Sequence, residues 1–245
     1  MQLFEGIIRE LRVYVDGVRA SRGLREVRCP EAAAWPAGRR GNVVLEPDTA
    51  VELGSPKDAS VAFLVLTTEL SLVRDAYVTL VGPDVGESLG RHLPFGKVVM
   101  LGVTGVTEEE CYERHREIDR VRYDLNLSGY MMRAASQHGR EWSRVSRQAV
   151  ETGFSLITLG SALIRLYRSM PRVACAEILL VTSSAEDVRA LETIGRKASR
   201  QIEAMSKMAT EVSRECDACG FSDVCSQVDG LRAMRSASKE GRRHV

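Results

Sequence analysis

The sequence contains no apolar run of about 18 residues, so we expect no membrane-spanning helix. Its N-terminus lacks the basic and then apolar layout of a secretory signal, which favours a cytoplasmic protein. It also lacks a phosphate-binding loop, a G-x-G-x-x-G motif and a G-x-S-x-G motif. With 34 basic and 33 acidic residues, the 245-residue chain has no charge excess of the kind that marks a nucleic-acid-binding protein. What remains is ordinary globular composition, with 44% apolar residues.

Lysine is scarce in this chain. Only five of the 34 basic residues are lysines and the other 29 are arginines. A codon bias toward arginine is the simpler explanation. A second interpretation is that guanidinium groups bind phosphate or carboxylate somewhere on the surface.

Three of the six cysteines, Cys216, Cys219 and Cys225, fall within ten residues. In a cytosolic chain such crowding favours metal or redox chemistry over structural disulfides. Thiolates at the spacing of Cys216 and Cys219 can face one ion, and Gly220 lets the backbone bring Cys225 back toward them. An iron–sulfur cluster and zinc both use such ligands, whereas a dithiol redox pair would not need the third cysteine. Ordinary free cysteines are the alternative.

The other cysteines, Cys29, Cys111 and Cys175, are isolated, and we expect each to be a small buried hydrophobe. Three local thiolates are one short of the usual four ligands. The fourth would come from one of these cysteines, from a non-cysteine group or from a partner. The four histidines are scattered, and His115, which lies between arginines and glutamates, is expected at the surface.

Hydrophobic patterning predicts an α+β fold in which a mixed or antiparallel sheet packs with helices. A long loop is expected over 17–42, where glycine, proline and arginine are frequent. Strands are expected over 3–15, 61–67, 77–81, 97–103 and 177–182. Helices are expected over 107–122, 129–137, 144–152, 159–169 and 184–212.

The last of these helices begins at Ser184 and carries one apolar stripe for more than six turns, which leads the chain to Cys216. We therefore divide the chain into four parts. Residues 1–60 are an irregular N-terminal segment with an insertion, and residues 61–213 are an α+β domain. Residues 214–230 are a Cys-rich metal-binding segment, and residues 231–245 are a basic tail.

Several short motifs resemble those of one anaerobic enzyme family. The segments Tyr77–Asp84 (Y-V-T-L-V-G-P-D) and Leu93–Gly96 (L-P-F-G) are similar to its V-I/V-G-P-D … L-P-L/F-G passage. The segment Trp142–Phe154 (W-S-R-V-S-R-Q-A-V-E-T-G-F) resembles its W-x-R-V-S-K-x-A-V-x-x-G-F. That family is the nickel-dependent acetyl-CoA synthase, the beta subunit of the CO dehydrogenase/acetyl-CoA synthase complex. The resemblance covers roughly residues 45–225 and the first ten.

The resemblance implies a middle domain with the first edge of the family's metal domain, as a stand-alone protein. Cys216, Cys219 and Cys225 match the family's leading cluster cysteines, which implies an iron–sulfur cluster, most simply [4Fe-4S], with zinc as the minor alternative. The family's Cys-Gly-Cys motif, which holds the distal nickel, has no counterpart in the sequence. We therefore expect no acetyl-CoA synthesis by this chain without a partner subunit.

The family's middle domain is associated with coenzyme A through a tryptophan and arginines near W-x-R-V-S. The matching residues are Trp142, Arg140, Arg144 and Arg147, and we expect the three arginines to share one helix face. Arg133 stands where the family has a second tryptophan. An indole suits an adenine ring and guanidinium groups suit phosphates. The alternative is a packed aromatic residue with solvated arginines around it.

Two functions are therefore predicted for the chain. The first is an iron–sulfur protein of anaerobic one-carbon or acyl-CoA metabolism, with its cluster on the CxxC-x5-C motif. The second is a non-catalytic subunit that binds coenzyme A or a partner, with zinc or no metal at the cysteines. Both predict a protein partner or a homo-oligomer, and neither predicts nucleic acid or membrane binding.

Overall fold

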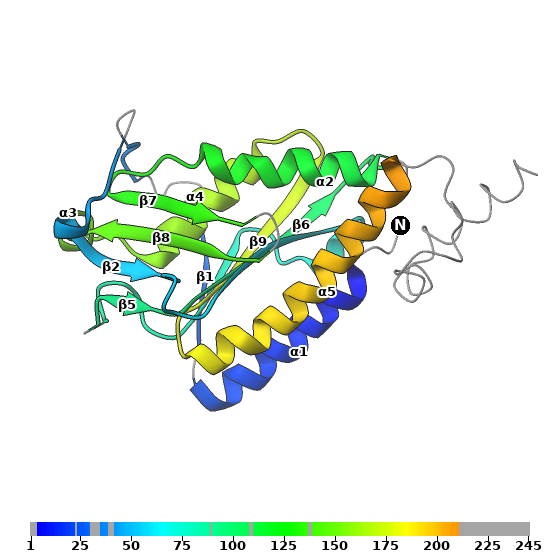
Figure 1. Cartoon of the computed structure of the whole chain (residues 1–245). Helices are drawn as coiled ribbons and strands as arrows, with labels where there is room; N and C mark the ends of the chain where they lie inside the picture. The colour runs from blue at the N-terminus through cyan, green and yellow to red at the C-terminus, as the bar shows by residue number, and fades with distance from the viewer. Residues whose placement is uncertain are drawn as a thin grey trace, which may run out of the picture.

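The computed structural model describes residues 4–22, 24–29, 35–38, 42–88, 90–107, 110–136 and 139–210. Its strands form a five-stranded sheet in the order β1-β4-β9-β6-β3 and a four-stranded sheet in the order β5-β2-β8-β7 (Figure 1). The strands are β1 Leu24–Arg28, β2 Thr49–Leu53, β3 Ser60–Thr67, β4 Tyr77–Val81, β5 His92–Leu93, β6 Phe95–Val103, β7 Tyr130–Ala135, β8 Glu141–Ser146 and β9 Val173–Val181. The α-helices are α1 Glu5–Arg22, α2 Cys111–Arg120, α3 Arg147–Glu151, α4 Leu156–Arg168 and α5 Ala185–Thr210. The predicted α+β class with a long C-terminal helix is confirmed.

The five-stranded sheet is mixed. The β4–β9 and β6–β3 pairs are parallel, whereas the β1–β4 and β9–β6 pairs are antiparallel. Strands β3 and β6 are buried along their whole length, and their sequences are nearly continuous apolar runs. Such runs are typical of strands that are covered on both faces. The strands predicted over 61–67, 77–81, 97–103 and 177–182 are therefore confirmed, within a few residues at their ends.

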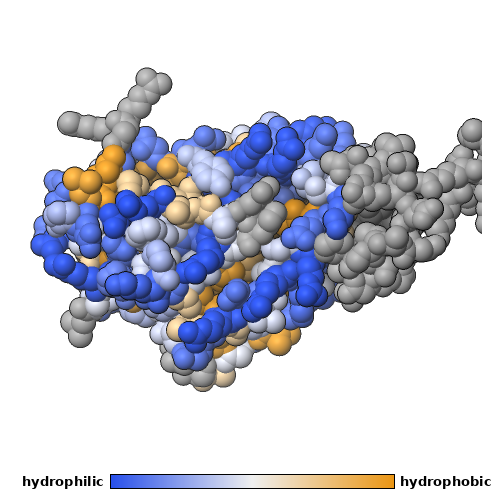
Figure 2. Space-filling model, viewed as in Figure 1, coloured by the Kyte–Doolittle hydropathy of each residue, from blue (hydrophilic) through white to orange (hydrophobic). Residues whose placement is uncertain are grey.

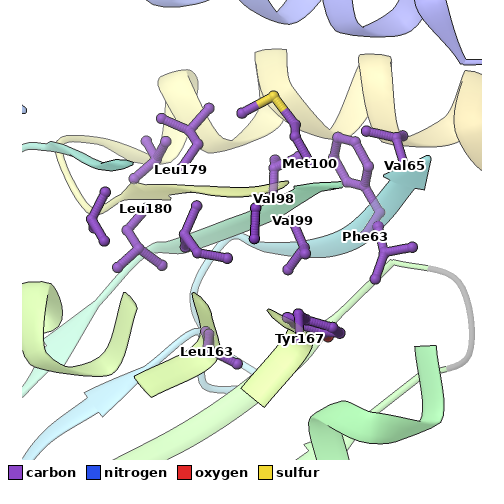
Figure 3. Packing of buried hydrophobic residues seen from close by; sticks show 14 of the residues in the cluster. Phe63, Val65, Val98, Val99, Met100, Leu163, Tyr167, Leu179 and Leu180 are labelled. Carbon is purple, nitrogen blue, oxygen red and sulfur yellow. The ribbon is translucent and has the colours of Figure 1, made fainter. Parts of the chain in front are cut away.

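Helices cover both faces of this sheet, with α5 against β3 and β6 and α4 against β4 and β9. Figure 3 shows that side chains of one strand pack on both faces of the sheet. Met100 points toward α5, whereas Val99 of the same strand points toward Leu163 and Tyr167 of α4. Successive side chains of a strand point to opposite faces, so one apolar run fills two layers of core.

Helix α1 lies beside α5 on the same side of the sheet (Figure 1). The Lys197 Nζ atom lies 2.6 Å from Glu10 Oε1, and the Tyr14 hydroxyl donates to the Asp187 backbone carbonyl at 3.1 Å. The outer surface in this view is mostly hydrophilic, with small apolar areas (Figure 2). Within the described residues, no helix is both long enough and apolar enough to span a bilayer.

The strand predicted over 3–15 is wrong, because residues 5–15 lie in helix α1. The buried side chains of α1 and the residue before it recur every three or four residues, which is the period of a helix. They are Phe4, Ile7, Ile8, Leu11, Val15 and Val18. The loop predicted over 17–42 is also wrong in its first part, where α1 continues to Arg22 and strand β1 follows.

The helix predicted over 129–137 is wrong, and the helix predicted over 144–152 is wrong in its first three residues. The first segment is strand β7, and the second begins in strand β8 and becomes helical only at Arg147, where α3 starts. Glu141, Ser143 and Val145 of β8 are buried at a spacing of two, which is the period of a strand. The Ser146 hydroxyl then accepts a hydrogen bond from the Ala149 amide at 3.2 Å and caps α3.

The isolated cysteines Cys29, Cys111 and Cys175 are buried, as predicted. The prediction for His115 is wrong, because this side chain is only 5% exposed. Its Nε2 atom lies 3.1 Å from the Leu64 carbonyl oxygen, and its ring stacks on Phe4 with the centroids 5.8 Å apart. His115 follows Cys111 by four residues, so both lie on the inner face of α2.

The predicted helix after Ser184 is confirmed. The Asp187 amide donates to the Ser184 hydroxyl at 3.1 Å, and α5 continues to Thr210. The cysteine-rich and basic segments, 214–230 and 231–245, lie outside the described residues. The four-part division of the chain therefore stays a prediction.

The contact between α4 and β4 leaves no room at Gly160. A Cβ atom built there would lie 2.6 Å from Val78 Cγ1, so Gly160→Ala forces the helix and the strand apart. We expect this substitution to lower the free energy of unfolding by about 1–3 kcal/mol, measured by urea denaturation. Gly17→Ala is the matched control, because Gly17 has open space and a helical alanine adds up to about 1 kcal/mol. Equal effects of the two substitutions would contradict this packing.

Candidate functional site

Three of the four residues predicted to bind coenzyme A lie close together, but on a strand rather than a helix. Trp142 and Arg144 are in β8, and Arg140 comes directly before it. Arg147 is the first residue of α3, so the prediction that the three arginines share a helix face is wrong. Since residues two apart in a strand point the same way, Trp142 and Arg144 share one face of the four-stranded sheet.

The Trp142 ring is fixed by Glu52 of the neighbouring strand β2. The indole Nε1 donates to Glu52 Oε2 at 3.1 Å, and the other carboxylate oxygen lies 2.9 Å from Arg144 Nη2. Arg144 also donates to the Val44 carbonyl at 3.4 Å, and its guanidinium carbon lies 5.3 Å from the centroid of the indole. Arg144 is therefore a buried, neutralised support for Trp142 rather than a free cation.

Arg133 is a site residue that the sequence interpretation did not include. Its guanidinium carbon lies 4.8 Å from the centroid of the Trp142 ring, and its side chain is exposed. The β7–β8 register shifts between Met132 and Ala134, and Arg133 occupies this irregularity. The sequence offered one indication of this role, because Arg133 stands where the family that the chain resembles has its second tryptophan. The structure brings these two positions into contact.

Trp142 and Arg140 line a pocket with a volume of 360 Å³ at the end of β7 and β8. Its walls also include Gly54, Pro56 and Ala135. Such a volume lies at the lower end of the range for small-molecule sites and accommodates a group of nucleoside size.

Arg140 forms part of the pocket wall and is held there by one end of its guanidinium group. Its Nη2 donates to the carbonyls of Ser55 and Asp58, at 3.3 and 2.9 Å. Because a guanidinium group has five N–H donors, Arg140 keeps further donors for a ligand. Arg147 is exposed and is not among the residues that line this pocket.

Glu141, which lines the same pocket, is fully buried and forms an ion pair with Lys97 of β6. The Tyr130 hydroxyl lies 3.3 Å from the Glu141 carboxylate and 2.9 Å from the Ser143 hydroxyl. Burial, and then the Glu141 charge, raise the pKa of Tyr130 well above its usual value, so the phenol stays protonated. The Ser60 hydroxyl of β3 donates to the Glu141 carbonyl at 2.6 Å.

This polar cluster joins the two sheets directly behind Trp142. Lys97 and Ser60 belong to the five-stranded sheet, whereas Glu141 belongs to β8. A backbone bond from the Ala62 amide to the Gly139 carbonyl, 3.0 Å long, completes the junction. The position of the Trp142 pocket therefore depends on a buried ion pair.

Removing one partner of this ion pair leaves the other charge buried without compensation. We expect Lys97→Met to lower the free energy of unfolding by about 3–5 kcal/mol, measured by urea denaturation. The double variant Lys97→Met/Glu141→Gln leaves no buried charge at this point, so it should recover much of the loss. A direct pair would be contradicted if the loss of stability in the double variant equalled the sum of the losses in Lys97→Met alone and in Glu141→Gln alone.

The predicted metal ligands Cys216, Cys219 and Cys225 lie outside the described residues. Between Phe4 and Thr210, across the ranges that the structure describes, no three His, Cys, Asp or Glu side chains form a group that could hold a metal ion. Helix α5 ends its described part six residues before Cys216.

Comparison with known proteins gives the same family over most of the chain. Residues 34–187 match the family described as the CO dehydrogenase/acetyl-CoA synthase complex beta subunit. The chain is 30% identical over 179 residues to the acetyl-CoA decarbonylase/synthase complex subunit beta of Methanothermobacter thermautotrophicus, covering 71% of this chain and 36% of that protein. It is 26% identical over 187 residues to the subunit of the same name from Archaeoglobus fulgidus, covering 73% of this chain and 34% of that one.

The chain thus spans about a third of the length of the curated relatives that it matches. The family match includes Trp142 and Arg140 with their pocket, as well as the Lys97–Glu141 pair. The protein described here belongs to the CO dehydrogenase/acetyl-CoA synthase complex beta subunit family.

Proposed function

We propose that this chain is a binding subunit of an acetyl-CoA synthase-type complex, and that it holds a coenzyme A-type ligand at Trp142. The observation that carries this proposal is that Trp142 and Arg140 line the same pocket. Family membership supports it, because the relatives are subunits of an acetyl-CoA decarbonylase/synthase complex.

The ligand end that suits this pocket is an adenine nucleotide. An adenine ring stacks on an indole, and Trp142 is held in one orientation by Glu52, so little side-chain freedom is lost on binding. Phosphate groups outside the pocket would meet the guanidinium groups of Arg140 and Arg133, which are both exposed. Arg133 lies over the indole and must move aside for stacking, which an exposed side chain does at small cost.

Calorimetry with coenzyme A tests this proposal. We expect Trp142→Ala to weaken binding by roughly ten- to a hundredfold, the usual loss for a stacked base. Arg140→Gln should weaken it by roughly tenfold, because one charge-assisted hydrogen bond is lost. The matched control is Arg147→Gln, a nearby exposed arginine outside the pocket, which should bind like the wild type.

Two outcomes of this titration would contradict the proposal. One is the absence of coenzyme A binding to the wild-type chain. The other is an equal loss in Arg140→Gln and Arg147→Gln, because it would indicate a diffuse charge effect rather than a pocket.

The chain also carries the CxxC-x5-C motif, for which an iron–sulfur cluster is the second proposed role. Its support is the spacing of Cys216, Cys219 and Cys225 and their match to the family's leading cluster cysteines. The other cysteines are buried in the core, so recruiting one of them as a fourth ligand would require opening it. A partner or a non-cysteine group is therefore the favoured source, and zinc is the minor alternative to iron.

Metal analysis after anaerobic purification tests this second role. We expect iron and acid-labile sulfide in a constant ratio to protein, with a strong loss of both in Cys216→Ser. Cys175→Ser is the matched control, because this buried thiol should not contribute. A colourless wild-type protein without iron would contradict an iron–sulfur cluster, and stoichiometric zinc would assign the motif to a structural site.

We propose acetyl-CoA chemistry for this chain only together with a partner subunit. The chain spans about a third of the relatives' length, and its sequence has no counterpart of the Cys-Gly-Cys motif. Carbon–carbon bond formation in the resembling family uses two metal sites. A role in anaerobic one-carbon or acyl-CoA metabolism is proposed on the same basis.

A further inference from the structure

A second, larger pocket lies beside the five-stranded sheet. Helix α4, the end of β1 and the residues just before β4 form its walls. Its volume is 860 Å³, which is within the range for binding sites of organic ligands. None of its described lining residues belongs to the Trp142 pocket. The proposed function makes no use of it.

Positive charge dominates the walls of this pocket. Arg28 comes from the end of β1, and Arg165 and Arg168 come from the last turn of α4. Among the described residues of the lining, Asp75 is the one acidic residue, and its carboxylate lies 3.3 Å from the Arg168 guanidinium. In the part of the chain that the structure describes, neither Arg28 nor Arg165 forms an ion pair or a side-chain hydrogen bond. Two guanidinium charges are therefore left for an anion.

The remaining wall is neutral and partly apolar. Ile164 contributes aliphatic surface, and the Cys29 thiol lies 2.7 Å from the Ser161 hydroxyl. Burial raises the pKa of the Cys29 thiol, so no thiolate opposes an anion near neutral pH. The pocket thus combines a cationic rim with a surface against which an organic group can lie.

We propose that this pocket is a separate binding site for an organic phosphate, with the phosphate oxygens on Arg28 and Arg165. Two guanidinium groups from different elements can bind two phosphates, or two sides of one phosphate. A single carboxylate would pair with only one of the two guanidinium groups. The volume is far larger than an inorganic ion needs, which indicates that the ligand has an organic body. The scarcity of lysine in the chain fits this use of planar guanidinium donors.

Calorimetry with pyrophosphate, at low ionic strength, tests the site without knowledge of the organic part. We expect measurable binding that weakens by roughly tenfold in Arg165→Gln and in Arg28→Gln. Arg189→Gln is the matched control, because Arg189 is an exposed helical arginine outside the pocket. Asp75→Asn should tighten binding severalfold, since it removes an acidic residue from the pocket lining and frees Arg168.

Two further arms separate this site from the Trp142 pocket and from general anion binding. Arg140→Gln should leave pyrophosphate binding unchanged, because Arg140 lines the other pocket, and succinate should bind more weakly than pyrophosphate. Thermal unfolding followed by circular dichroism shows that each variant is folded. The proposal would be overturned by absent pyrophosphate binding, by equal losses in Arg165→Gln and Arg189→Gln, or by weaker binding in Asp75→Asn. A loss in Arg140→Gln with Arg165→Gln unchanged would place the anion in the other pocket instead.

Discussion

The buried ion pair between Lys97 and Glu141 sets the relation between the two sheets. A charge inside a protein is costly unless its partner and its remaining hydrogen bonds are in place. Here Lys97 faces the carboxylate, and Tyr130 and Ser143 supply further hydrogen-bonding groups around it. Because Glu141 immediately precedes Trp142, the same pair fixes where the indole stands. The arrangement specifies one position of β8 against β6, and the candidate ligand pocket depends on that position.

Buried carboxylates are matched by cations elsewhere in the fold as well. Glu52 is paired with Arg144, and Glu177 of β9 lies 2.6 Å from Arg12 Nη1 and 2.8 Å from Arg74 Nη2. A guanidinium binds both oxygens of a carboxylate at once, which suits these enclosed positions. Arg144, Arg12 and Arg74 therefore have a structural role. The functional proposals rest instead on exposed guanidinium groups at the two pockets.

The sequence predicted the parts of the fold whose signal is long or continuous. The strands over 61–67 and 97–103 are nearly continuous apolar runs, and α5 repeats its apolar spacing over many turns. Some segments with mixed polarity, such as 3–15 and 129–137, were assigned wrongly. Strand β8 buries Glu141 and Ser143, so its inward face is polar, and only the partners across the sheet junction reveal that these residues face the core.

The candidate site was predictable in its residue types but not in its geometry. The resemblance singled out Trp142 and Arg140, and the structure places both in one pocket. The partner of the indole, Glu52, is 90 residues away in the sequence, and no local pattern connects the two. Arg133 reaches the indole through a register shift between β7 and β8, a feature that depends on strand pairing. Such long-range pairings follow from the assembled sheet, which a local pattern does not contain.

The fluorescence of Trp142 tests the central claim most directly, because the chain has only two tryptophans. Trp35 lies edge-on to Phe154, and Trp35→Phe keeps an aromatic ring there while leaving Trp142 as the single indole. Adding coenzyme A to this variant should quench the emission in a saturable way, since a stacked adenine contacts the excited ring. If coenzyme A binds by calorimetry while the Trp142 emission stays unchanged, the ligand does not occupy this pocket and the account is contradicted.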